Sequence, residues 1–174
     1  MAPLLRRSWA MKGQPPQQHQ RVGHREKVSV AAALWLTPRR DRLHLAYQTL
    51  VNGYYSNIEV ADFLQAAVDG LPAPAVIIWD GGTMHKGGPI RDLVEESHGR
   101  LEIEPLPANA PELMPTEQVW NWLKYSRLSN YAPRNARELN ARVVQELDAI
   151  REQQQLLTSL FHLSDLPLPR ALLF

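Results

Sequence analysis

Two carboxylates, Asp80 and Glu117, are the residues of this 174-residue chain whose type and spacing most clearly suggest chemistry. Asp80 ends the apolar run 75–79, and Glu117 lies just inside the start of a predicted helix that begins at Pro115. Both side chains would then lie at the same end of a sheet, where two carboxylates can share a divalent metal ion. We therefore hypothesise metal-dependent phosphoryl chemistry on nucleic acid.

The composition excludes several other kinds of site. The chain contains no cysteine, which rules out disulfides, thiolate catalysis and zinc sites with cysteine ligands. No apolar run approaches the roughly 18–20 residues that a membrane span needs, and the N-terminus lacks the apolar core of a signal peptide. We expect a soluble, cytoplasmic protein with one domain at residues 27–160, between a basic arm (1–26) and an apolar, proline-containing tail (161–174).

The arm carries an unbalanced charge. Residues 1–25 contain no Asp or Glu but have five basic residues: Arg6, Arg7, Lys12, Arg21 and Arg25. This segment therefore carries +5 and the rest of the chain −4, within the net charge of +1. A basic segment rich in proline and glutamine, without helical or strand periodicity, either contacts the phosphates of nucleic acid or is a solvated leader.

The first half of the domain predicts two strands, a helix and a third strand. Residues 27–36 form a nearly continuous apolar run that suits a buried central strand, and the alternation from Leu43 onward predicts a hairpin. Ser56 and Glu59 form a capping box at the start of a helix. The apolar run up to Asp80 then predicts a buried strand, and this order of elements indicates an α/β layer.

The second half continues the alternation. Pro89 suits the first turn of a helix, residues 101–106 form a short strand, and Pro115 begins the helix that carries Glu117. A last predicted helix, for packing or oligomerisation, has four apolar residues on one face: Leu139, Val143, Leu147 and Ile150.

Three motifs in these elements resemble those of one known family. They are Trp79-Asp80 followed by His85; Pro111-Glu-Leu-Met-Pro-Thr-Glu117-Gln-Val-Trp120 followed by Lys124; and Arg6-Arg-Ser-Trp9. Over most of its length the chain resembles the DDE-type transposases (DDE superfamily endonucleases) of bacterial insertion sequences related to mariner elements. The element from Pro111 to Trp120 is the most specific of the three.

The resemblance implies an RNase H-like α/β fold, with a mixed five-stranded sheet flanked by helices. In this family three acids bind two divalent metal ions, Mg²⁺ or Mn²⁺, and activate water and then a DNA 3′-hydroxyl for in-line attack on a phosphodiester. Asp80 matches the second acid and Glu117 the third, and they enclose 36 residues, close to the spacing in the family. Oxygen-rich carboxylates suit these metals.

The chain also departs from the family pattern. The first acid normally lies on the central strand, before the segment matched by Arg6 to Trp9, and neither Asp41 nor Asp62 is a credible replacement. The helix-turn-helix region that normally precedes the catalytic domain is missing as well. Without the central strand, the strand of residues 27–36 and the strand ending at Asp80 would have unpaired edges.

Two smaller departures flank the acids. Gly81-Gly-Thr83 replaces the Asn-Ala-Pro-like residues that usually follow the second acid. Met114 stands where an Asn commonly caps the helix of the third acid, which removes a cap worth about 1 kcal/mol.

We therefore interpret the chain as the C-terminal part of a transposase, truncated or encoded in the second frame of a split element, and inactive alone. An alternative is a non-catalytic remnant that binds DNA or oligomerises with intact transposase. A third possibility, an unrelated α/β hydrolase using Asp80 and His85, lacks a nucleophile elbow to support it.

The expected partners are DNA, as element ends and target, together with a second copy or an upstream transposase segment, in the bacterial cytoplasm at the nucleoid. The candidate DNA-binding residues are Arg6, Arg7, Lys12, His85 and Lys124. For His85 a structural or DNA-proximal role is favoured over a role as metal ligand, and Trp120 and Trp122 are interpreted as packing residues.

Overall fold

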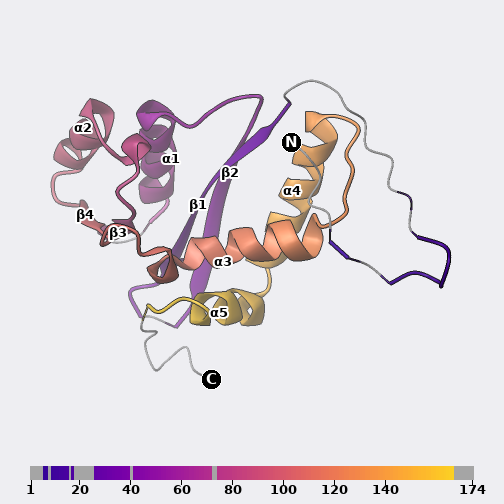
Figure 1. Cartoon of the computed structure of the whole chain (residues 1–174). Helices are drawn as coiled ribbons and strands as arrows, with labels where there is room; N and C mark the ends of the chain where they lie inside the picture. The colour runs from indigo at the N-terminus through magenta and orange to yellow at the C-terminus, as the bar shows by residue number, and fades with distance from the viewer. Residues whose placement is uncertain are drawn as a thin grey trace.

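The strands of this protein form two separate pairs (Figure 1). The computed structural model describes residues 6–7, 9–15, 17, 26–39, 41–71 and 74–166. Strands β1 (Val28–Leu36) and β2 (Leu43–Val51) are antiparallel, with Val28 opposite Val51 and Leu36 opposite Leu43. Strands β3 (Ala75–Trp79) and β4 (Leu101–Pro105) are parallel. Within the described residues β1 therefore pairs with β2 alone and β3 with β4 alone, which agrees with the predicted unpaired edges.

Local sequence signals explain why the first elements form where they do. At the turn between β1 and β2 the Thr37 hydroxyl donates to Asp41 Oδ1 at 2.6 Å, and this hydrogen bond lowers the pKa of the Asp41 carboxyl. Helix α1 (Asn57–Asp69) begins with the predicted capping box, in which the Ser56 side chain and Glu59 satisfy each other's backbone N–H groups. The predicted hairpin and the predicted capping box are both confirmed.

The remaining helices follow the proline and asparagine signals. Helix α2 (Gly88–Glu96) and helix α3 (Pro115–Trp122) have proline in their first turn, and α4 (Ala136–Arg151) is capped by the side chain of Asn135. Two features were not predicted. Helix α3 continues as a π-helix over Leu123–Arg127, and a further helix, α5 (Gln154–His162), follows α4.

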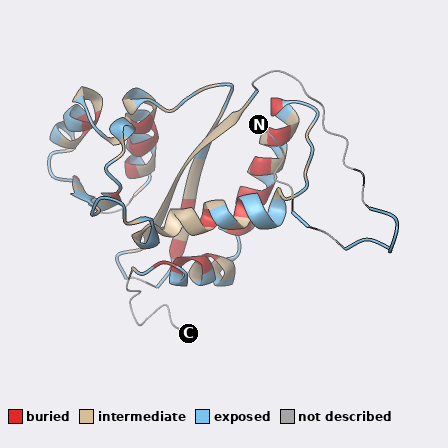
Figure 2. Ribbon diagram, viewed as in Figure 1, coloured by how far each residue is buried: buried red, intermediate tan, exposed pale blue. Residues whose placement is uncertain are grey.

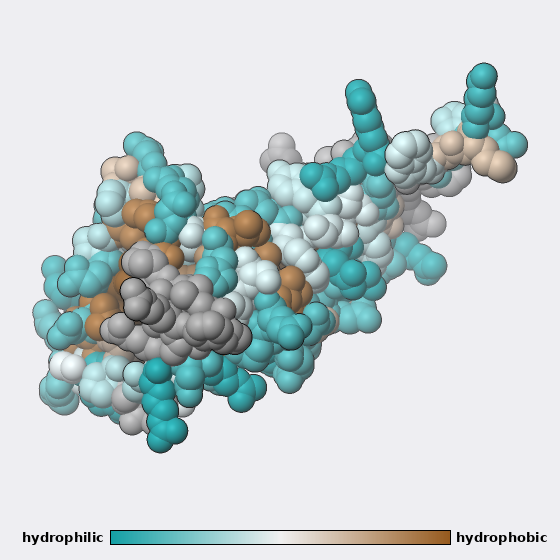
Figure 3. Space-filling view, turned by 90° about the horizontal axis from the view of Figure 1, so that it is seen from below, coloured by the Kyte–Doolittle hydropathy of each residue, from teal (hydrophilic) through white to brown (hydrophobic). Residues whose placement is uncertain are grey.

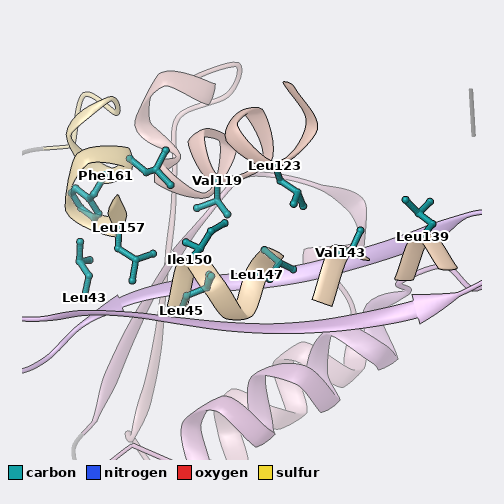
Figure 4. Packing of buried hydrophobic residues seen from close by; sticks show 11 residues of the cluster. Leu43, Leu45, Val119, Leu123, Leu139, Val143, Leu147, Ile150, Leu157 and Phe161 are labelled. Carbon is teal, nitrogen blue, oxygen red and sulfur yellow. The ribbon is translucent and has the colours of Figure 1, made fainter. Parts of the chain in front are cut away.

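Eleven buried residues form what we call the large core, between the β1–β2 hairpin and helices α3, α4 and α5 (Figure 4). They are Leu43, Leu45, Val119, Leu123, Leu139, Val143, Leu147, Ile150, Leu157, Leu160 and Phe161. The hairpin is also tied to α4 by the Tyr47 hydroxyl, which donates to Asp148 Oδ1 at 2.7 Å. Burial and this carboxylate raise the pKa of Tyr47 to about 12.

Eight buried residues form the small core, between α1, α2 and the β3–β4 pair (Figure 2). They are Val60, Phe63, Leu64, Val68, Trp79, Ile90, Leu93 and Leu101. Strand β1 contributes to both cores. Its even-numbered residues pack against the large core, whereas Ala31 and Ala33 pack against the small core. All nine β1 residues are therefore half-buried rather than fully buried as predicted.

Strand β3 corrects another prediction. The apolar run before Asp80 predicted a strand buried on both faces, yet the side chains of Val76 and Ile78 are 57% and 50% exposed. Only the alternate residues Ala75, Ile77 and Trp79 pack against the small core. The reason is that helices α1 and α2 cover one face of the β3–β4 pair, and the described residues leave the other face open.

Some predictions concern segments outside the described residues. These include Arg21 and Arg25 of the arm and residues 167–174 of the tail. The longest described helix, α4, has 16 residues, and none of the described helices has the length and apolar character needed to cross a bilayer.

Candidate metal centre and nucleic-acid interface

Asp80 directly follows β3, and the loop after it holds one of its two carboxylate oxygens. The backbone N–H of Gly82 donates to Asp80 Oδ1 at 2.9 Å, while the side chain remains 58% exposed. A Cβ atom at Gly82 would lie only 3.0 Å from this oxygen. A side chain at position 82 would therefore crowd the carboxylate.

His85 contacts the same carboxylate from the end of a short 3₁₀ turn over Thr83–His85. Its Nδ1 lies 2.8 Å from Asp80 Oδ1 and 3.1 Å from the Asp80 carbonyl oxygen. Because both oxygens can only accept, Nδ1 carries the hydrogen. The imidazole also stacks on the Trp79 ring, with centroids 4.4 Å apart and planes 4° from parallel. The structure thus places His85 against the acid, and its contact with DNA stays a prediction.

Glu117 lies in the first turn of α3, as predicted. Met114 occupies the N-cap position and makes no side-chain cap, which also agrees with the sequence analysis. The Glu117 side chain is half-buried, and its carboxylate has no hydrogen-bond or ion-pair partner within the described part of the chain. A carboxylate in the first turn interacts favourably with the positive end of the helix dipole, and without a protein partner it is available to a cation.

Asp80 directly follows the carboxyl end of β3, and Glu117 follows β4 in the chain, at the start of α3. The N–H of Leu106, just after β4, donates to the Trp79 carbonyl at 2.7 Å, so the chain leaves β4 beside the residue that precedes Asp80. A 3₁₀ turn over Pro111–Leu113 then leads into α3 and Glu117. Strand ends of this kind commonly form the ligand site of an open α/β sheet.

Two carboxylates with only oxygen donors fit Mg²⁺ or Mn²⁺, which commonly bind one or two carboxylates and complete their shells with water and substrate phosphate. Among the described residues no group of three or more His, Cys, Asp or Glu side chains could hold a metal. Asp41 is engaged in the hairpin turn, and Asp62 is exposed on α1. Neither residue is recorded in contact with Asp80 or Glu117.

A cluster of basic side chains surrounds the π-helix. The Arg6 backbone N–H donates to Asn130 Oδ1 at 2.9 Å, and its guanidinium donates to the Tyr125 carbonyl at 3.1 Å and lies over the Tyr125 ring. Tyr125 is the neighbour of Lys124, which is exposed. The structure thus places Arg6 of the arm against the π-helix that also carries Lys124.

The other described residues of the arm are exposed. Arg7 and Lys12 are exposed, and the Trp9 side chain is 101% exposed. In the space-filling view the N-terminal segment extends from one end of the molecule, away from the apolar patches on the body (Figure 3). Nothing in the described contacts of Arg7 or Lys12 competes with a phosphate.

A second ionic feature was missed by the sequence analysis. Glu146, 2% exposed on α4, accepts from Arg127 Nε at 2.5 Å and from Arg142 Nη2 at 2.7 Å. Arg127 also lies over the Trp122 ring. The spacing of Arg142 and Glu146 on one helix was a visible signal, but the contribution of Arg127 depends on the π-helix.

Comparisons with known proteins bear on this arrangement. The sequence profile described as DDE superfamily endonuclease matches residues 2–140. The structure resembles the Mos1 strand transfer complex (TM-score 0.61, 16% identity, 92% of this chain and 46% of that chain). It also resembles the Mos1 mariner paired end complex with Mn (0.63, 15%, 93% and 48%).

The catalytic domain of Mos1 mariner transposase is a third similar structure (TM-score 0.50, 13% identity, 83% of this chain and 78% of that chain). At these identities the likeness shows the fold, which is the predicted RNase H-like α/β fold. The chain spans about half the length of the first two transposase chains. No functionally curated protein matches the sequence.

Proposed function

Because this chain belongs to the DDE superfamily endonucleases, we propose that it is the catalytic part of a mariner-related insertion-sequence transposase that cuts and joins DNA. The observation that carries the proposal is the placement of Asp80 and Glu117 beyond the ends of β3 and β4. Such a protein would act at the nucleoid, in the cytoplasm of a bacterium.

Asp80 and Glu117 are the residues that would hold the divalent cation. Asp80 Oδ1 is occupied by Gly82 and His85, so Oδ2 is the oxygen left for the metal. The Glu117 carboxylate has no competing partner among the described residues. A divalent cation bound there would neutralise charge on a phosphodiester and favour deprotonation of the attacking water or hydroxyl.

We further propose that cleavage needs a third carboxylate, carried on a strand that pairs with the open edges of β1 and β3. At one end of the hairpin the Asn52 N–H donates to the Lys27 carbonyl, and at the other end the Thr37 N–H donates to the Arg42 carbonyl. The backbone groups of the odd-numbered residues Lys27 and Thr37 therefore face β2. Since hydrogen bonding alternates along an antiparallel strand, the backbone groups of the even-numbered β1 residues point to the open edge. An upstream segment, or a second transposase chain, would supply the strand.

The basic cluster supports a second candidate function, DNA binding without cleavage. Arg6 lies over the ring of Tyr125, the neighbour of Lys124 in the chain, and Arg6, Arg7 and Lys124 are all exposed. Basic side chains on phosphates release counterions, so such binding would be independent of sequence and would weaken steeply with salt. A chain restricted to this role would still bind DNA after loss of Asp80.

One experiment separates the two functions. Mn²⁺ binding to the full chain is measured by electron paramagnetic resonance, and nicking of supercoiled plasmid is measured with and without an upstream segment that supplies an acid-bearing strand. We expect Asp80→Ala and Glu117→Ala to weaken Mn²⁺ binding, whereas Asp62→Ala, an exposed acid on α1, leaves it unchanged.

We expect no nicking by the chain alone and Asp80-dependent nicking with the added segment. Asp80-dependent nicking by the chain alone would refute the need for a third acid. Mn²⁺ binding that is equal in wild type and Asp80→Ala would refute the metal site. Salt-sensitive DNA binding without either activity would favour the second function.

A further inference from the structure

The loop after Asp80 fixes the orientation of the carboxylate that the proposed function assigns to the metal. We propose that His85 is a positioning residue, whose Nδ1–H holds Asp80 Oδ1 so that Oδ2 is presented to the cation. This inference rests on the proposed function, which assigns Asp80 as a metal ligand, but the orientation itself exists without metal and can be tested without it.

The hydrogen bonds are divided unequally between the two oxygens of Asp80. Oδ1 accepts from the Gly82 N–H at 2.9 Å and lies 2.8 Å from His85 Nδ1, whose hydrogen also faces the Asp80 carbonyl at 3.1 Å. Among the described residues no contact to Oδ2 exists, and the side chain is 58% exposed. Two donors on one oxygen restrict rotation of the carboxylate and direct the other oxygen away from the loop.

The imidazole is itself held in place. Its ring stacks on Trp79, which is 8% exposed and belongs to the small core. His85 also donates to the Asp80 carbonyl, which ties the ring to the backbone of the same residue. The side chain of His85 is only 19% exposed. The buried Trp79 ring thus positions the His85 ring, and the His85 ring in turn positions the Asp80 carboxylate.

Close approaches occur at both ends of the loop after Asp80. A Cβ atom at Gly82 would lie 3.0 Å from Asp80 Oδ1 and 3.4 Å from His85 Nδ1. At the far end of the loop, Gly87 has a φ of +115°, and a Cβ there would lie 2.6 Å from Asn57 Nδ2. Asn57 in turn donates to the Lys86 carbonyl. Both ends of the loop are therefore fixed, one against Asp80 and the other against α1.

The test uses two substitutions at His85 that separate stacking from hydrogen bonding. His85→Phe keeps a flat ring on Trp79 but removes the donor, whereas His85→Asn keeps a donor near the position of Nδ1 but removes the stack. His44→Phe is the matched control, because His44 stacks on Trp35 in the same way, with centroids 5.2 Å apart, on the hairpin. Circular dichroism verifies that each variant is folded.

The first measurement needs no metal. In the ¹⁵N–¹H spectrum of the full chain, the Gly82 amide reports the hydrogen bond to Asp80 Oδ1. We expect its proton resonance to move upfield in His85→Phe, to stay near the wild-type position in His85→Asn, and to be unchanged in His44→Phe. An unchanged Gly82 amide in His85→Phe would overturn the positioning role, whatever the metal does.

The second measurement is Mn²⁺ affinity. Loss of a residue that orients a metal ligand typically weakens binding by roughly ten- to hundredfold, so we expect this loss in His85→Phe and most of the affinity to return in His85→Asn. Wild-type affinity in His85→Phe would overturn the inference. If wild type itself shows no Asp80-dependent Mn²⁺ binding, the proposed function fails, and the amide measurement alone then decides whether His85 orients Asp80.

Discussion

The two acids of the candidate site are supported by two regions that differ in how completely their side chains are buried. Glu117 lies on α3, which packs into the large core, whereas Asp80 follows β3 of the small core. Of the six largest fully buried side chains, five belong to the large core and one, Leu101, to the small core. The small core also has a sheet face on which Val76 and Ile78 are exposed.

This difference explains why the two acids are held by different means. The position of Glu117 is set by the burial of its helix, through Val119 and Leu123, and its carboxylate has no partner among the described residues. Asp80 lies on an exposed strand end, and local hydrogen bonds from Gly82 and His85 orient it instead. A cation bound by both acids would connect the two regions, so its affinity would depend on both kinds of support.

Matched Leu→Ala substitutions directly test whether the large core contributes more to stability than the small core. They should have the largest effect on the free energy of unfolding. Leu147 of the large core is 0% exposed and Leu93 of the small core is 8% exposed. Burial of this kind makes Leu→Ala cost about 2–5 kcal/mol, and we expect Leu147→Ala near the upper end and Leu93→Ala near the lower end. Urea unfolding measures both. Equal costs, or a larger cost for Leu93→Ala, would contradict the comparison.

The buried carboxylate of Glu146 is a polar feature of the large core without a counterpart in the small core. Glu146→Ala leaves Arg127 and Arg142 without their shared partner, and removing one member of a buried ion pair is strongly destabilising. Since the two arginines are 45% and 34% exposed, they can be partly rehydrated, and we expect a cost of about 2 kcal/mol.

Urea unfolding again measures this cost. Glu152→Ala serves as the control, because its side chain is 78% exposed in its pair with Arg151. We expect the control to cost less than about 1 kcal/mol, as exposed pairs do. A loss for Glu146→Ala no greater than that of the control would show that the buried ions contribute nothing specific to the large core.

Features that depend on neighbouring residues could be predicted from the sequence. The capping box at Ser56, the first-turn prolines and the position of Glu117 depend on spacings of a few residues, and all were predicted. Helix α5 left a similar signal, with Leu157, Leu160 and Phe161 at the spacing of one helical face, but it was overlooked.

Features that depend on distant elements could not be predicted. The apolar run of β3 does not show that only one of its faces is covered, because the covering helices are set by tertiary packing. Of the two partners of Glu146, Arg142 comes from α4 and Arg127 from the π-helix, which has no sequence signature. The motif Asp-x4-His suggested a functional pair, yet the return of His85 to Asp80 depends on its stacking on Trp79.

In their helix caps it is the small core, not the large core, that has the better-stabilised element. Substitutions at these caps should have the smallest effect on stability. Helix α1 of the small core has a complete capping box at Ser56, whereas α3 of the large core has Met114 at its N-cap. We expect Ser56→Ala to destabilise the protein and Met114→Asn to stabilise it, each by about 1 kcal/mol. Thermal unfolding measures both, and a destabilising Met114→Asn would show that the start of α3 does not tolerate a polar cap.

The effect of Ser56→Ala should also depend on pH in a direction that the capping box fixes. The hydrogen bond from the Ser56 hydroxyl, followed by that from the Ser56 backbone, lowers the pKa of Glu59 below 4.5 in the folded protein. A carboxyl with a lowered folded pKa contributes stability above its unfolded pKa and loses it as the pH falls through the folded pKa. The difference in stability between wild type and Ser56→Ala should therefore shrink as the pH falls below 4.5. In a Glu59→Gln background, which has no carboxyl to titrate, the same difference should not change with pH, and a change there would assign the dependence to another group.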